Sequence, residues 1–149
     1  MHLVWCVDTS VASWQSFFMS IRQLNDPEGF AKIVRQWIEE RQYSELFQNG
    51  CCFHFALRAF EAGIGDLHAI ELPAAKDGIE HVFVMTPDDE MFDNYGYQSL
   101  SNRYRNRKPF PITKHEVEKW ISSRCLPSSL EKVVFEIADQ IIAKNRKQI

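Results

Sequence analysis

The sequence predicts one α+β domain over residues 1–149, with a small antiparallel sheet of about three strands between two groups of helices. Two patterns lead to this prediction. Apolar residues recur at helical spacing in five segments: 11–24, 27–47, 51–63, 114–123 and 128–147. Between them lie three short runs rich in β-branched and aromatic residues or alternating in polarity: 67–72, 81–85 and 91–95.

The N-terminal helices are delimited by capping and breaking residues. Asp8, Thr9 and Ser10 precede the first apolar repeat and are suitable N-caps. Pro27 then starts the second helix, because proline suits the first helical turn. Gly50 ends a short break, after which the two adjacent cysteines open the third helix.

The strands and the C-terminal helices follow from the same kind of signal. Pro73 closes the first strand, the polar turn 86–90 joins the next two strands, and Gly96 ends the third. Thr113 and Glu116 have the spacing of a capping box at the start of the next helix. The polar and basic residues 101–111 are expected to form a loop.

Composition excludes several function classes. The 149 residues are 45% hydrophobic and carry a formal net charge of −3, so a packed core is expected and a nucleic-acid partner is not. The apolar runs are too short to span a membrane, and the N-terminus lacks the pattern of a secretion signal, so a cytoplasmic location is expected. The four cysteines include no CxxC pair; they are expected to stay reduced, with no metal and no cofactor.

The segment from Gly50 to Phe55 carries the strongest chemical signal. A thiol at the start of a helix is favoured as thiolate by the unpaired N–H groups and the partial positive charge there. His81 and Asp93 lie later, in consecutive strands of a hairpin. If Met85 pairs with Met91, or if the register shifts by two, both side chains project from the same face. The spacing therefore permits a Cys-His-Asp triad.

In this order of residues and elements, the chain resembles the papain-like superfamily, particularly its transglutaminase-like and small bacterial peptidase or amidase branches. The segment Gly50-Cys51-Cys52-Phe53-His54-Phe55 is similar to the glycine-x-cysteine-aromatic pattern around the papain-family nucleophile. The resemblance covers about a third of the chain. It implies Cys52 as nucleophile, with Cys51 as the alternative, His81 as general base and Asp93 as its orienting group. Gln48 or Asn49 would supply an oxyanion donor.

The expected activity is that of a cysteine-dependent hydrolase or acyl transferase acting on an amide or isopeptide bond of a protein or peptide. A short catalytic unit of this kind is similar to bacterial effector and toxin domains, which are secreted or injected. The alternative is a non-catalytic immunity or regulatory protein on the same fold. A protein partner could then bind the basic stretch that runs from Arg103 to Lys108, although a solvated loop is the favoured interpretation of that stretch.

The remaining histidines and cysteines are weaker candidates. His54 lies about 200° round the helix from Cys52 and is expected at the surface or in flank packing. His68, on the neighbouring strand, is the reserve candidate for the base. His2 and His115 are expected at the surface, and Cys6 and Cys125 in packing positions.

Overall fold

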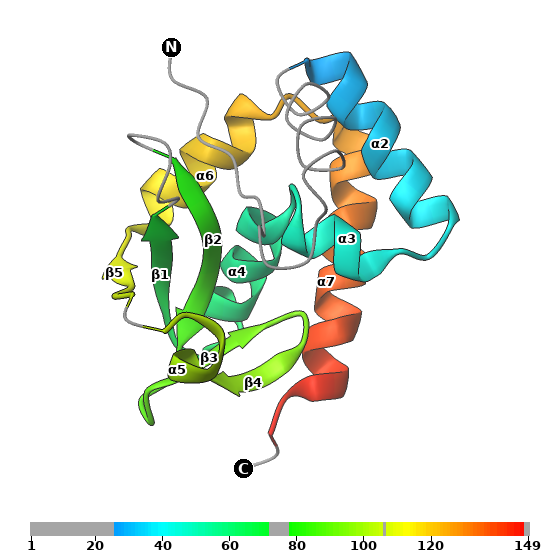
Figure 1. Cartoon of the computed structure of the whole chain (residues 1–149). Helices are drawn as coiled ribbons and strands as arrows, with labels where there is room; N and C mark the ends of the chain where they lie inside the picture. The colour runs from blue at the N-terminus through cyan, green and yellow to red at the C-terminus, as the bar shows by residue number, and fades with distance from the viewer. Residues whose placement is uncertain (1–25, 72–77, 106, 148–149) are drawn as a thin grey trace.

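The computed structural model describes residues 26–71, 78–105 and 107–147, and it confirms the α+β class. Figure 1 shows helix α4 running behind the sheet, with α6 on one side of it and α7 on the other. The helix expected over residues 11–24 lies outside the described residues, as do His2 and Cys6.

The segment 27–47 forms two helices rather than the single one expected. Helix α2 spans Pro27–Glu39 and α3 spans Tyr43–Gln48. Between them Arg41 adopts a positive φ of 56°, which the right-handed helix does not allow. The start of α2 agrees with the sequence, since Asp26 accepts a hydrogen bond from the backbone N–H of Glu28 and proline follows at once.

The third helix is confirmed. Helix α4 spans Cys52–Glu61, with Cys51 at its N-cap position. Its sequence is apolar nearly all round, and most of its side chains are buried, as expected of a helix at the centre of a domain.

The sheet has five antiparallel strands in the order β4-β3-β2-β1-β5, two more than expected. The expected strands are present as β1 (Asp66–Glu71), β2 (Ile79–Met85) and β3 (Glu90–Asp93). The additional strands, β4 (Gly96–Ser99) and β5 (Phe110–Pro111), are very short and lie at the two edges. A tight turn joins β3 to β4, and Gly96 serves it with a φ of 88°.

The two faces of the sheet are covered by different elements. Val82, Val84 and Phe92 belong to the main core, together with α4. Phe83 and Met91 point to the other face, since strand side chains alternate. There they form a smaller cluster with Tyr104, which follows helix α5 (Leu100–Arg103).

Two C-terminal helices complete the core. Helices α6 (Lys114–Ser123) and α7 (Ser128–Asn145) both pack against α4. The capping box is confirmed, because Thr113 accepts from the Glu116 backbone N–H and the Glu116 carboxylate accepts from the backbone N–H of Thr113. None of the described helices is long and apolar enough to cross a membrane.

Gly65 lies where the chain enters β1, and its environment generates a test of the fold. A Cβ atom there would lie 2.1 Å from the backbone oxygen of Met85, so strand β2 would have to move. We expect Gly65→Ala to lower the free energy of unfolding by about 1–3 kcal/mol, measured by urea denaturation. The exposed Ser129→Ala serves as control and should change it by less than about 0.5 kcal/mol. Equal stability of the two variants would contradict the described packing.

Candidate active site

His81 and Asp93 form a buried pair. The Nε2–H of His81 donates to Oδ2 of Asp93 over 2.8 Å, and the two side chains are only 1% and 2% exposed. Met85 pairs with Met91 and Val84 with Phe92, which is the first of the two registers considered from the sequence. The condition that both side chains share one face of the hairpin is therefore met.

Further donors surround the Asp93 carboxylate. Its Oδ2 also accepts from Nη1 of Arg103 at 2.7 Å and from Nε2 of Gln48 at 3.3 Å. Its Oδ1 accepts from the backbone N–H of Tyr95 at 2.9 Å and from Nε2 of Gln98 at 2.7 Å. We call Asp93, His81 and these four donor residues the Asp93 network.

The network keeps Asp93 ionised. Burial alone raises the pKa of this carboxyl group. The hydrogen bond and charge of His81, the charge of Arg103 and the Tyr95 N–H outweigh that effect and lower the pKa from 3.8 to about 2. At neutral pH Asp93 is therefore an anion that fixes the orientation of the His81 ring.

The two adjacent cysteines differ in state. Cys51 is free and fully buried, and burial raises the pKa of its thiol to about 12 despite the nearby charge of Arg124. Cys52, the first residue of α4, is 1% exposed and disulfide-bonded. The expectation that the cysteines stay reduced is therefore wrong for Cys52. Cys125 is free but exposed, so the packing role expected for it is also wrong.

The start of α4 is tied to the Asp93 network through the residues just before it. Gln48 is the last residue of α3 and stands four residues before Cys52. The backbone N–H of Cys51 donates to the carbonyl of Leu46, which holds the break between the helices in a compact turn. Because Nε2 of His81 is directed at Asp93, its Nδ1 is the atom with which it would act on a thiol.

The predicted oxyanion donors are directed at other groups. The side-chain amide of Gln48 donates to Asp93 and to the Asn94 side chain, while that of Asn49 donates to Glu45 over 2.6 Å. An oxyanion role for Gln48 or Asn49 stays a prediction, and it would require these hydrogen bonds to be exchanged.

The basic stretch 103–108 is only partly the solvated loop that its composition suggests: Arg105 and Lys108 are exposed, but Arg103, Tyr104 and Arg107 are not. The Arg103 side chain is only 11% exposed and Tyr104 is buried. Arg107 pairs with the buried Glu80 at 2.9 Å and also donates to the backbone carbonyl of Glu71. The sequence offered one signal for this arrangement, an alternation of arginine with tyrosine that is typical of guanidinium–ring stacking.

The other histidines lie away from this network. His54 is fully buried against Phe135, so of the two positions expected for it the surface is wrong and flank packing holds. Neither of its ring nitrogens has a hydrogen-bond partner among the described residues. His68 donates from Nδ1 to the carbonyl of Asp66 over 3.0 Å. It lines a groove of about 700 Å³ near Met85, at the opposite end of β2 from His81. His115 is exposed, as expected.

Comparison with known proteins finds no matching protein-family model, no matching curated protein and no matching solved structure. Within residues 26–71, 78–105 and 107–147, no group of three or more His, Cys, Asp or Glu side chains is placed to hold a metal ion.

The buried His54 generates a prediction about acid stability. Burial, followed by the charge of Arg124, lowers the pKa of His54 from 6.5 to about 3. Because the unfolded chain binds this proton more readily, the stabilisation is complete above about pH 6.5 and is lost as the pH falls towards 3. At pH 4.5 we expect this one group to cost about 3 kcal/mol of unfolding free energy.

The variant His54→Leu removes this titration at similar side-chain volume. Its urea-unfolding free energy should therefore fall less than that of the parent between pH 7 and pH 4.5. Replacing the exposed His115 by glutamine is the control and should leave the parent's pH dependence unchanged. Parallel curves for the parent and His54→Leu would contradict the assignment.

Proposed function

We propose that the protein is a papain-like, cysteine-dependent hydrolase or acyl transferase that acts on an amide or isopeptide bond of a peptide or protein. The observation that carries the proposal is the buried His81–Asp93 pair, 2.8 Å apart and linked through Gln48 to the segment that leads into α4. Thiol acyl transfer requires a cysteine and a histidine that is oriented by a carboxylate, and the pair supplies the second of these.

Each residue of the triad has a defined task. Nδ1 of His81 accepts the thiol proton of Cys52, and the thiolate attacks the carbonyl carbon of the substrate. The imidazolium then protonates the leaving amine, and an acyl-thioester remains on Cys52. Water as the second nucleophile completes hydrolysis, whereas an amine completes transfer. Asp93 stays ionised throughout and stabilises the imidazolium.

The disulfide at Cys52 makes this chemistry dependent on reduction. A sulfur bound in a disulfide has no thiol proton to give and no thiolate to attack with. A dithiol reductant exchanges with the disulfide, becomes oxidised itself and releases the Cys52 thiol. Activity should therefore need a reductant.

A non-catalytic immunity or regulatory role is the second candidate. It is favoured by the burial of both adjacent cysteines and by the high pKa of the Cys51 thiol, which keeps that group protonated at neutral pH. A structural disulfide at Cys52 would then contribute stability alone.

Thiol reactivity at pH 6 separates the two candidates. After reduction of the full chain, iodoacetamide should label Cys52 stoichiometrically within minutes, as read by peptide mass mapping. In His81→Ala the rate should fall at least about tenfold, because the thiolate loses its proton acceptor. His68→Ala is the matched control, since His68 also lies in the sheet but outside the Asp93 network, and it should leave the rate unchanged.

Mapping separates Cys52 from Cys51 and Cys125 in the same experiment. Labelling of Cys52 only above pH 8, at a rate that His81→Ala does not change, would rule out the enzyme and leave the non-catalytic candidate.

A further inference from the structure

Arg103 spans two elements of the Asp93 network with one guanidinium group. Its Nη1 donates to Oδ2 of Asp93 over 2.7 Å, and its Nη2 donates to the side-chain oxygen of Gln48. The first contact is on the hairpin and the second is at the end of α3. The planar guanidinium group of arginine holds its N–H donors at fixed relative positions, which lets one side chain make both hydrogen bonds.

Aromatic rings hold the guanidinium in place. Its central carbon lies 5.5 Å from the ring centroid of Tyr95 and 5.3 Å from that of Tyr104. Tyr104 is itself buried against Phe83, on the side of the sheet that α5 covers. With the side chain only 11% exposed, the charge of Arg103 is poorly screened by water.

Arg103 also sets the net charge of the Asp93 network. Gln48 of this network stands four residues before Cys52, and an unpaired Asp93 anion would disfavour a second anion there, the Cys52 thiolate. Arg103 binds the same carboxylate oxygen that His81 binds, so the carboxylate and guanidinium charges largely cancel. The positive charge of a protonated His81 then remains to favour the thiolate.

We propose that Arg103 is a positioning residue for the thiol–imidazole chemistry, because it neutralises Asp93 and clamps the hairpin to the segment that carries Cys52. The inference rests on the proposed function. Arg103 would thus join the three residues of the triad as a fourth functional side chain. It comes from the basic stretch that composition alone assigns to a loop.

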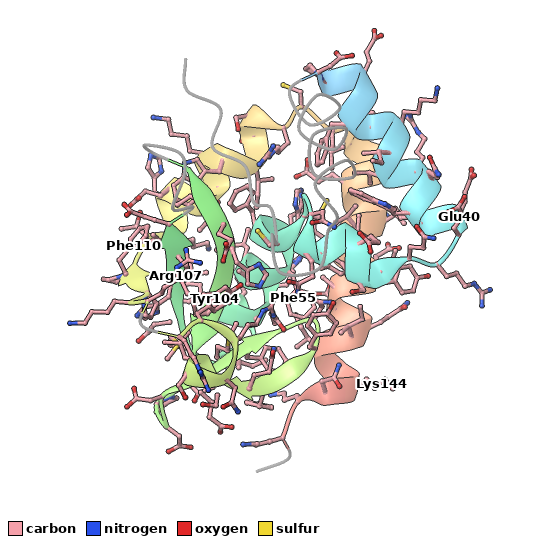
Figure 2. All side chains as sticks on the ribbon, in the orientation of Figure 1. Glu40, Phe55, Tyr104, Arg107, Phe110 and Lys144 are labelled. Carbon is pink, nitrogen blue, oxygen red and sulfur yellow. The ribbon has the colours of Figure 1, made fainter. Side chains whose placement is uncertain are left out.

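The chain offers a matched control in Arg107. It lies in the same stretch, and its central guanidinium carbon is 5.6 Å from the same Tyr104 ring, but its ion pair is with Glu80 rather than with Asp93. Figure 2 shows Arg107 and Tyr104 close together at the sheet.

The test is the pH profile of Cys52 alkylation, measured on the reduced full chain by peptide mass mapping from pH 5 to pH 9. In Arg103→Gln the midpoint of the profile should rise by about one pH unit, the effect of removing one poorly screened positive charge from the Asp93 network. Arg107→Gln should leave the midpoint within about 0.2 units of the parent. An unchanged midpoint in Arg103→Gln, or an equal shift in both variants, would overturn the proposal.

A third variant keeps the test decisive if Arg103→Gln fails to fold by circular dichroism. Arg103→Lys retains the positive charge but loses the pair of guanidinium hydrogen bonds. The midpoint of its profile should therefore stay near that of the parent, while the limiting alkylation rate falls several-fold. If both the alkylation rate and the midpoint of Arg103→Lys equal those of the parent, the proposed role of Arg103 in linking the hairpin to α3 is contradicted. The His81→Ala result separates the two proposals, because dependence on His81 without dependence on Arg103 contradicts only this inference.

Discussion

A single buried anion organises this part of the molecule. Asp93 is 2% exposed, and a carboxylate removed from water to that extent is costly unless donors replace its hydration. The donors come from β2, α3, α5 and β4, together with the backbone of the turn after β3. The need to satisfy Asp93 therefore brings four elements to one point, on the face of the sheet that carries Phe83, and one of these elements, α3, ends four residues before Cys52.

Burial raises the pKa of both the Asp93 carboxyl group and the Cys51 thiol, but the net shifts of the two groups are opposite. Around Asp93 the charged and polar donors outweigh burial and lower the pKa, so the carboxylate persists far below neutral pH. Around Cys51 burial outweighs the charge of Arg124 and raises the pKa of the thiol to about 12. Cys51 is thus held as a neutral thiol, and under the proposed function this leaves the chemistry to its neighbour Cys52 once that residue is reduced.

Local signals in the sequence were sufficient for much of the fold and for the centre of the site. The start of α4, the capping box at Thr113 and the register that pairs Met85 with Met91 all depend on residues close together in the chain. The sequence left two registers open, and both place His81 and Asp93 on one face of the hairpin.

What the sequence could not predict depends on contacts between distant segments. The break at Arg41 requires a positive φ that arginine seldom adopts, and the edge strands β4 and β5 are too short to have a pattern. Arg103 was assigned to a solvated loop, and a surface position was one of two expected for His54, because charge and polarity usually indicate exposure. Their burial is set by Asp93 and by the packing of α4 against α6 and α7, and local spacing contains no information about either.

The most direct measurement is a crystal structure of the protein after reduction, in which the separation between Nδ1 of His81 and Sγ of Cys52 is read. The account predicts a distance of about 3–4 Å, within reach of proton transfer, with Nε2 of His81 still directed at Asp93. A separation beyond about 7 Å, or a ring rotated away from Asp93, would contradict it.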